Sequence, residues 1–174
     1  AESTVSAVSD SATLQSVGAS YSPKATYPGG SLSNYLKIAA RYITGGLKTK
    51  IYYTSRGGFD NHANEVVATA PETGTLANNL ADVAGSVKAF LDDVKAHGQG
   101  KRVMVMVWSE FGRRLGENGS VGTDHGHGGI AFLAGEAIKG GLYGKPPDLS
   151  AAKTPYNRYY IPFDSNSMDF RNMY

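Results

Sequence analysis

Two short segments of the chain combine histidine with acidic residues at close spacing. Asp60 and His62 form the first, and residues 124–127 form the second, in which an acid and two histidines fall within four positions. Imidazole nitrogens and carboxylate oxygens are protein ligands of zinc, and manganese and calcium bind the oxygens as well. The sequence therefore predicts a site for a divalent metal (zinc, manganese or calcium), whose ligands are Asp60, His62, Asp124, His125 and His127.

A structural explanation competes with the metal site for the first segment. Asp and Asn side chains in loops often bond to nearby backbone amides, so Asp60 can form a turn or cap a helix without binding an ion. Residues 124–127 are harder to explain in this way, because packing does not require two histidines and an acid at this density. His97 lies at the C-terminus of a predicted helix, where a cation stabilises the helix dipole, and is expected to be structural.

A further segment supplies two candidate catalytic residues. Glu110 comes directly after an apolar stretch and can act as a base, as an additional metal ligand or only as a partner for Arg113. Arg113, with Arg114 beside it, can hold an anionic substrate through paired hydrogen bonds. A solvated turn explains the two arginines about equally well.

Apolar periodicity predicts two helices that position these segments. Apolar side chains recur at helical spacing over residues 32–43, where Ser31 or Ser33 can cap the start and Gly45-Gly46 can end the helix in a left-handed turn. A second apolar stripe predicts a helix from about residue 73 to residue 97, with a glycine directly after it.

Three short segments are predicted to be β-strands. Residues 50–54 are rich in aromatic side chains, residues 130–133 are apolar, and residues 102–108 are apolar almost without interruption. An apolar run without alternation is typical of a parallel strand covered on both faces. The methionines of this run and Trp108 are therefore expected in the core.

The order helix, strand, helix, strand predicts an α/β fold with a mostly parallel sheet flanked by helices. Residues 51–53 and 103–107 would then be parallel neighbours. Ligands bind at the carboxyl ends of the strands of such sheets, so Asp60, His62, Glu110 and residues 124–127 are expected to converge. Residues 1–30 carry little apolar periodicity, which predicts a poorly patterned N-terminal segment followed by one domain over residues 31–174.

The composition excludes several classes of protein. A chain of 174 residues is long enough for one domain with a core. A formal net charge of +2, with no block of Lys or Arg, argues against nucleic acid as the partner. The absence of cysteine excludes disulfides, thiolate metal sites and a cysteine nucleophile, and no apolar run has the length of a membrane span.

Several motifs, in this order, resemble the bacterial family called domain of unknown function 1501. They are Gly57-Gly58-Phe59-Asp60-Asn61-His62, Val107-Trp108-Ser109-Glu110-Phe111-Gly112-Arg113-Arg114, Glu117-Asn118-Gly119-Ser120 and Gly122-Thr123-Asp124-His125-Gly126-His127-Gly128. Residues 139–144 and Asp169-Phe170-Arg171 also fit, so the resemblance extends over roughly residues 30–174.

The resemblance implies a fold similar to the alkaline phosphatase and sulfatase superfamily, in proteins that often carry twin-arginine export signals. A periplasmic or extracellular location is therefore expected. Asp60 and His62 resemble the first ligand pair of that superfamily, and His125 or His127 resembles its last ligand. Ser109-Glu110-Phe111-Gly112 departs from the Ser-Asp-His-Gly of the middle position, so that one imidazole is missing and Glu110 can supply only oxygen.

The function implied by the resemblance is metal-dependent hydrolysis of a phosphate or sulfate ester, with Arg113 clamping the anion. The alternative is a non-catalytic exported binding domain on the same scaffold, which the missing Asp-His pair favours. The superfamily's nucleophile belongs to an N-terminal half that nothing here resembles, and the helix that opens near residues 167–169 stops after about one turn. We therefore expect a truncated, C-terminal part of a longer protein, which binds a metal weakly and does not turn over simple esters.

Overall fold

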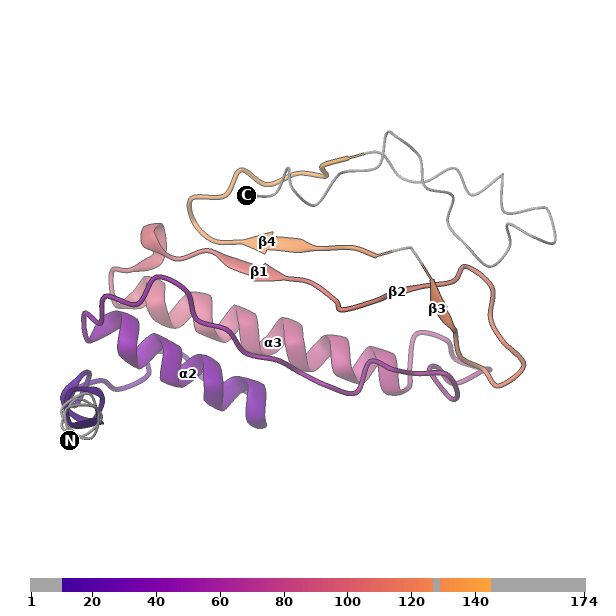
Figure 1. Cartoon of the computed structure of the whole chain (residues 1–174), viewed down its shortest axis with the longest axis horizontal. Helices are drawn as coiled ribbons and strands as arrows, with labels where there is room; N and C mark the ends of the chain where they lie inside the picture. Colours follow the sequence, from indigo (N-terminus) through magenta and orange to yellow (C-terminus); the bar gives the residue numbers. More distant parts are fainter. Residues whose placement is uncertain (1–10, 127–128, 145–174) are drawn as a thin grey trace, which may run out of the picture. The chain divides into compact units, whose positions relative to one another are not determined.

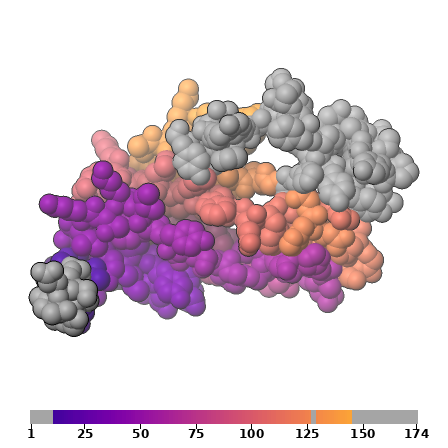
Figure 2. All heavy atoms as spheres, viewed as in Figure 1, coloured from indigo at the N-terminus to yellow at the C-terminus, as the bar shows by residue number. Residues whose placement is uncertain are grey.

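A computed structural model describes residues 11–126 and 129–144. The remaining residues are grey in Figures 1 and 2. The described elements are a helical turn at residues 11–16, α2 (Ser31–Thr44), α3 (Thr75–Ala96), a 3-10 turn at Gly100–Arg102, β1 (Val105–Val107), β2 (Gly112–Arg113), β3 (His125–Gly126) and β4 (Phe132–Ala134). None of the described helices has the length and apolar character needed to cross a membrane.

The prediction of a mostly parallel sheet flanked by helices, as in alkaline phosphatases, is wrong. The described strands form two small antiparallel pairs, β1 with β4 and β2 with β3. Residues 50–54 form neither a helix nor a strand, so residues 51–53 are not parallel neighbours of β1.

The apolar run at residues 102–108 misled the fold prediction. Only Val105–Val107 joins a ladder, and those residues are half-buried rather than covered on both faces. Met104 and Trp108, which were expected in the core, are 56% and 57% exposed. An unbroken apolar run therefore does not distinguish a buried parallel strand from a short antiparallel one.

The two predicted helices are confirmed, and both end at a glycine in the left-handed region. At the end of α2, Gly46 has φ 81°, and the N–H of Leu47 reaches back to the carbonyl of Tyr42 at 3.0 Å. Gly98 has φ 75° after α3, and the N–H of Gln99 donates to the Val94 carbonyl at 2.8 Å. Glycine adopts this conformation without the steric cost of a Cβ, which explains both helix ends.

The N-terminus of α2 differs from the prediction. Gly30 is the N-cap residue, and no side chain caps the helix. Ser33 is buried instead, and its hydroxyl lies 2.8 Å from that of Ser86 on α3. The serine predicted as a cap thus connects the two helices, because it falls on the buried face of α2.

The described residues divide into two compact units, each assembled from separate stretches of the chain. The first comprises residues 11–57, 80–105 and 135–137. The second comprises residues 58–79, 106–126, 129–134 and 138–144. In the first unit, α2 packs against the C-terminal part of α3 through an apolar core of Leu32, Leu36, Ala39, Ala40, Phe90 and Val94.

A buried carboxylate fixes the segment before α2 to α3 in the first unit. Asp93 is completely buried, and it accepts hydrogen bonds from Tyr21 Oη (2.5 Å), Tyr27 Oη (2.9 Å) and the backbone N–H of Lys24 (2.7 Å). These donors satisfy a charge that would otherwise be costly to bury. Burial, and then the hydrogen bond to Asp93, raises the pKa of both tyrosines well above its usual range.

Candidate metal centre

Asp60, His62 and His125 bring three potential ligand atoms together in the second unit. The Nε2 atom of His62 lies 2.9 Å from Asp60 Oδ1, and that of His125 lies 2.7 Å from the same oxygen. Each residue offers one donor atom, and the three donor atoms lie within 4.8 Å of one another. Among the described residues, this is the one group of at least three acidic or imidazole side chains with such spacing.

The three side chains leave access for further ligands. Their exposed fractions are 62% for Asp60, 49% for His62 and 48% for His125. Two imidazoles and one carboxylate fill only part of the coordination sphere of a divalent metal. The arrangement can therefore hold an ion and still leave positions for water or substrate.

Backbone hydrogen bonds hold the two loops that carry these side chains. Thr123 donates its N–H to the carbonyl of Asn61 at 3.2 Å, and Glu65 donates to Val121 at 2.8 Å. The short β2–β3 pair places Arg113 opposite His125. Residues far apart in the sequence thus meet through a few local backbone contacts, without a large sheet.

Two glycines permit the close approach of these backbones. A Cβ atom on Gly122 would lie 2.5 Å from the carbonyl carbon of His62, and one on Gly126 would lie 2.6 Å from the nitrogen of Arg114. Both distances are far too short for a side-chain carbon. The glycines beside the histidine and acidic residues therefore serve loop packing at the site.

Asp124 contacts the other ring nitrogen of His62. Its Oδ1 lies 3.3 Å from His62 Nδ1, and Asn118 Nδ2 donates to the same oxygen at 3.2 Å. The second carboxylate oxygen accepts from Arg114 Nη1 at 3.4 Å. Asp124 is therefore adjacent to the donor group but is not one of its three members.

Arg113, which lies on β2, and Phe111, which directly precedes β2, both contact members of the donor group. Arg113 donates to the carbonyls of Phe59 (2.5 Å) and Thr123, and its Nη2 lies 3.4 Å from Asp60 Oδ1. Phe111 stacks on the ring of His125, with centroids 4.0 Å apart and an interplanar angle of 12°. Sequence reasoning did not assign a site role to Phe111 or Asn118, although both lie inside the motifs that carried the resemblance.

The electrostatic environment keeps both aspartates ionised. The hydrogen bond from His125, aided by the charges of His62, His125 and Arg113, lowers the pKa of Asp60 below its usual value. The hydrogen bonds from Asn118 and His62 do the same for the pKa of Asp124, with a smaller contribution from the Arg114 charge. Ionised carboxylates are the form that binds cations.

The structure thus brings together three of the predicted ligands, Asp60, His62 and His125, and places Asp124 beside them. Glu110 is exposed and is not a member of the donor group among the described residues. His127 lies outside the described residues. The anion-clamping role of Arg113 stays a prediction.

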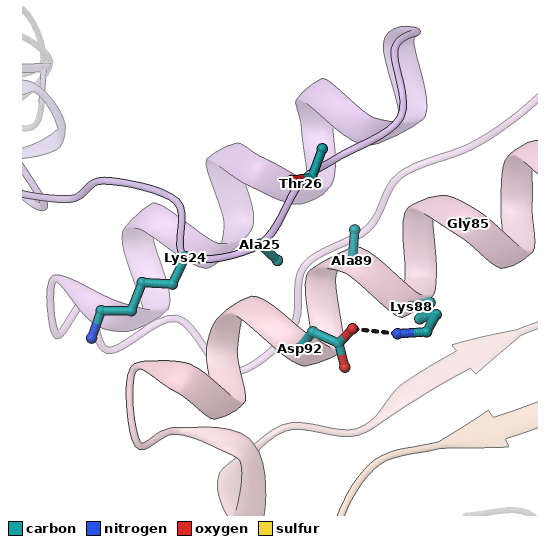
Figure 3. Close-up of a pocket in the computed structure, with 7 residues that line it drawn as sticks. All are labelled: Lys24, Ala25, Thr26, Gly85, Lys88, Ala89 and Asp92. Carbon is teal, nitrogen blue, oxygen red and sulfur yellow. Dashed lines mark hydrogen bonds and ion pairs between the residues drawn. The ribbon is translucent and has the colours of Figure 1, made fainter.

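A depression in the first unit is a poorer candidate for a functional site. It has a volume of about 270 Å³ between residues 24–26 and α3 (Figure 3). Two of its charged side chains, Lys88 and Asp92, form an ion pair with each other at 2.5 Å, and the Lys24 ammonium donates to the Ala96 carbonyl at 3.1 Å. These charged side chains are therefore bonded to other groups of the protein, and no histidine lines the depression.

Comparison with known proteins connects this site with a family. No curated protein and no solved structure matches the chain. One family model does match, over residues 18–159, and it therefore includes every residue of the donor group. The chain belongs to the family described as protein of unknown function (DUF1501).

Proposed function

We propose that this domain holds a divalent metal through Asp60, His62 and His125 and serves the hydrolysis of a phosphate or sulfate ester. The observation that carries the proposal is the convergence of three donor atoms within 4.8 Å from two loops that lie 65 positions apart. Such convergence of two imidazoles and a carboxylate suits a metal better than it suits a turn or a helix cap.

The donor set narrows the choice of metal. Calcium takes oxygen ligands almost exclusively, whereas zinc and manganese-like ions accept imidazole. Two of the three donors here are imidazole nitrogens. We therefore favour zinc or manganese over calcium.

The surrounding residues have separable roles in this proposal. A bound divalent ion would neutralise an anionic ester and stabilise the charge that develops in its transition state. Arg113 positions the donor loops, because its guanidinium bonds to two backbone carbonyls and faces Asp60. Glu110, which is exposed, remains available as a proton acceptor. We assign no nucleophile within the described residues.

A second candidate function is non-catalytic binding of an anion by the same metal site. It is supported by the internal bonds of Arg113, which commit the arginine to the loops rather than to a substrate. A metal-bearing domain without a nucleophile would still recognise a phosphate or sulfate group. The two functions differ in turnover, not in metal binding.

We also propose that the protein is exported to the periplasm or beyond the cell. Support comes from the resemblance described above, which implies proteins that often carry twin-arginine export signals. Fractionation of the source cells, followed by detection with an antibody against this chain, tests the proposal. Recovery in the cytoplasmic fraction alone would contradict it.

Calorimetric titration with zinc and manganese, on protein purified without a metal-affinity column, tests the metal site. We expect about one ion per chain. His62→Ala and His125→Ala should each weaken binding at least about 100-fold, which exceeds the usual effect of losing an outer-shell partner. His97→Gln is the matched control, because His97 belongs to the first unit and should leave binding unchanged.

Two outcomes would reject the metal site: no binding by the unchanged protein, or an equal loss in His97→Gln. Assays with a phosphate and a sulfate ester of nitrophenol then test turnover by these residues. We expect this chain to bind metal without turning over either ester, because we assign no nucleophile within the described residues, and the hydrolysis proposed here needs one supplied from outside them. Turnover that His125→Ala abolishes would instead place the nucleophile within these residues.

A further inference from the structure

We infer that Asp124 is a positioning residue that fixes the imidazole of His62, by accepting a hydrogen bond from Nδ1 so that Nε2 is left to bind the metal. This inference rests on the proposed function, because it assigns the outer shell of the same site. It also gives Asp124 a different role from that of a direct ligand.

The two nitrogens of His62 face two different carboxylates. Nδ1 lies 3.3 Å from Asp124 Oδ1, and Nε2 lies 2.9 Å from Asp60 Oδ1. A neutral imidazole has one N–H and one lone pair, and the partner of one nitrogen decides which nitrogen carries the proton. Without an ion, both nitrogens face a carboxylate acceptor. When an ion takes the lone pair of Nε2, the nitrogen beside Asp60, the proton must be on Nδ1, where Asp124 accepts it.

Asp124 is itself held in place by its neighbours. Asn118 Nδ2 donates both to Asp124 Oδ1 at 3.2 Å and to the backbone carbonyl of His62 at 2.8 Å. The orientation of this amide is fixed, because its Oδ1 accepts the backbone N–H of Ser120 at 2.9 Å and that of Gly122 at 3.3 Å. The NH₂ group must therefore point toward Asp124.

Both carboxylate oxygens of Asp124 have partners other than the proposed ion. Oδ1 faces Asn118 and His62, and Oδ2 accepts from Arg114 Nη1 at 3.4 Å. A carboxylate that binds an imidazole N–H and is anchored by other donors is the usual outer-shell partner of a metal-bound histidine. Asn118, Asp124 and His62 thus form one connected chain that ends at the proposed ion.

The decisive substitution is Asp124→Asn, with Glu65→Gln as its matched control. Glu65 is another acid of the same loops, and it accepts from Thr123 Oγ1 at 2.7 Å. An asparagine can rotate its NH₂ group toward Nδ1 and favour the opposite tautomer of the ring. We expect zinc affinity to fall about 10- to 100-fold in Asp124→Asn and to change less than about twofold in Glu65→Gln.

Nitrogen NMR of the imidazoles reports which ring nitrogen of His62 is protonated and which binds zinc. A purely structural role of Asp124 would not change this assignment. In the unchanged protein with zinc bound, His62 should coordinate through Nε2 and carry its proton on Nδ1. Asp124→Asn should lose this pattern at the same zinc concentration, and Glu65→Gln should keep it. The result for the unchanged protein does not require any variant to fold.

Each outcome bears on one of the two proposals. An unchanged protein that binds zinc, with the same affinity and tautomer in Asp124→Asn, overturns the role of Asp124 and leaves the metal site standing. A loss as large as that of His62→Ala, or coordination through Nδ1, also overturns it, because Asp124 would then act as a ligand or face the wrong nitrogen. Absence of zinc binding by the unchanged protein rejects the proposed function, and the role of Asp124 is rejected with it.

Discussion

A methyl group on Gly122 would lie 2.5 Å from the carbonyl carbon of His62 and 2.6 Å from its oxygen. Gly122→Ala must therefore push apart the two loops that carry the donor atoms. We expect the substitution to lower the free energy of unfolding by about 1–3 kcal/mol, as for other overpacked sites. The affinity for zinc should fall as well. Titration calorimetry measures the affinity, and urea denaturation measures the unfolding free energy.

Gly119→Ala is the control for this substitution. No atom lies within 4 Å of a Cβ at Gly119, which belongs to the same loop. Its stability should change by no more than about 0.5 kcal/mol. Equal effects of the two substitutions would mean that loss of glycine flexibility, and not the contact with His62, is responsible.

At the scale of single residues, the sequence indicated which residues could bind a metal better than it indicated which contacts each of them makes. Asp60, His62 and His125 were predicted as ligands because of residue type and spacing, and the structure places them together. The contact of Asp124 with Nδ1 depends on how the loops dock, which no local pattern encodes. The stacking of Phe111 on His125 depends on the β2–β3 pairing and was missed for the same reason.

Ser33 on α2 and Ser86 on α3 share a buried hydrogen bond of 2.8 Å where the two helices pack. Ser33→Ala leaves the Ser86 hydroxyl with a long contact of 3.5 Å to the carboxylate of Asp82 on α3. We expect a loss of about 1–3 kcal/mol of unfolding free energy, since a buried hydroxyl is left poorly satisfied. Urea denaturation followed by circular dichroism measures the loss.

The double variant Ser33→Ala/Ser86→Ala provides the internal check on this pair. Removing the second hydroxyl also removes the poorly satisfied group, so the double variant should lose less than the sum of the two single losses. Strict additivity would show that the hydrogen bond contributes nothing to the packing of α2 on α3.

The tyrosines bound to Asp93 should make the stability of the first unit depend on pH in the alkaline range. The pKa of Tyr21 and Tyr27 is raised in the folded state, so their contribution to stability is complete below the unfolded value of about 10. It is lost as the pH rises above that value, because the unfolded chain then releases protons that the folded chain retains. The unfolding free energy should therefore decline above about pH 10.

Tyr21→Phe/Tyr27→Phe should flatten this decline, although it also removes two donors to Asp93 and lowers stability at neutral pH. Tyr53→Phe is the control, because Tyr53 belongs to the same unit and is 76% exposed. Denaturation at several alkaline pH values checks the expectation. A decline as steep in the double variant as in the unchanged protein would contradict it.

At the scale of elements, helices were predictable and sheet topology was not. The apolar periods of α2 and α3 are local, and each helix is followed by a glycine that ends it, so both were predicted nearly to their bounds. The strands pair over only two or three residues each. Pairing this short leaves little signal in the sequence, and a continuous apolar run is as compatible with a short antiparallel strand as with the predicted parallel one.

At the scale of the whole molecule, the donor group belongs to one of the two compact units. Zinc at about 100 times its dissociation constant should raise the unfolding free energy by about 2.7 kcal/mol. Hydrogen exchange should slow in the two site loops, residues 58–65 and 113–125, and a chelator should reverse both effects. Exchange measured by mass spectrometry, with unchanged rates in these loops at saturating zinc, would count against the site.

The separation of the donors along the chain has a consequence for the time at which an ion can be bound. Asp60 is synthesised 65 residues before His125. At about 5–20 residues per second, the ribosome needs roughly 3–13 s to supply the third donor. Until then a nascent chain presents at most two, and the hydrogen bonds that join the loops cannot form before residues 120–123 exist. Binding of the ion that we propose would therefore have to follow synthesis of His125, and the ion bound would be the one available where these loops come together.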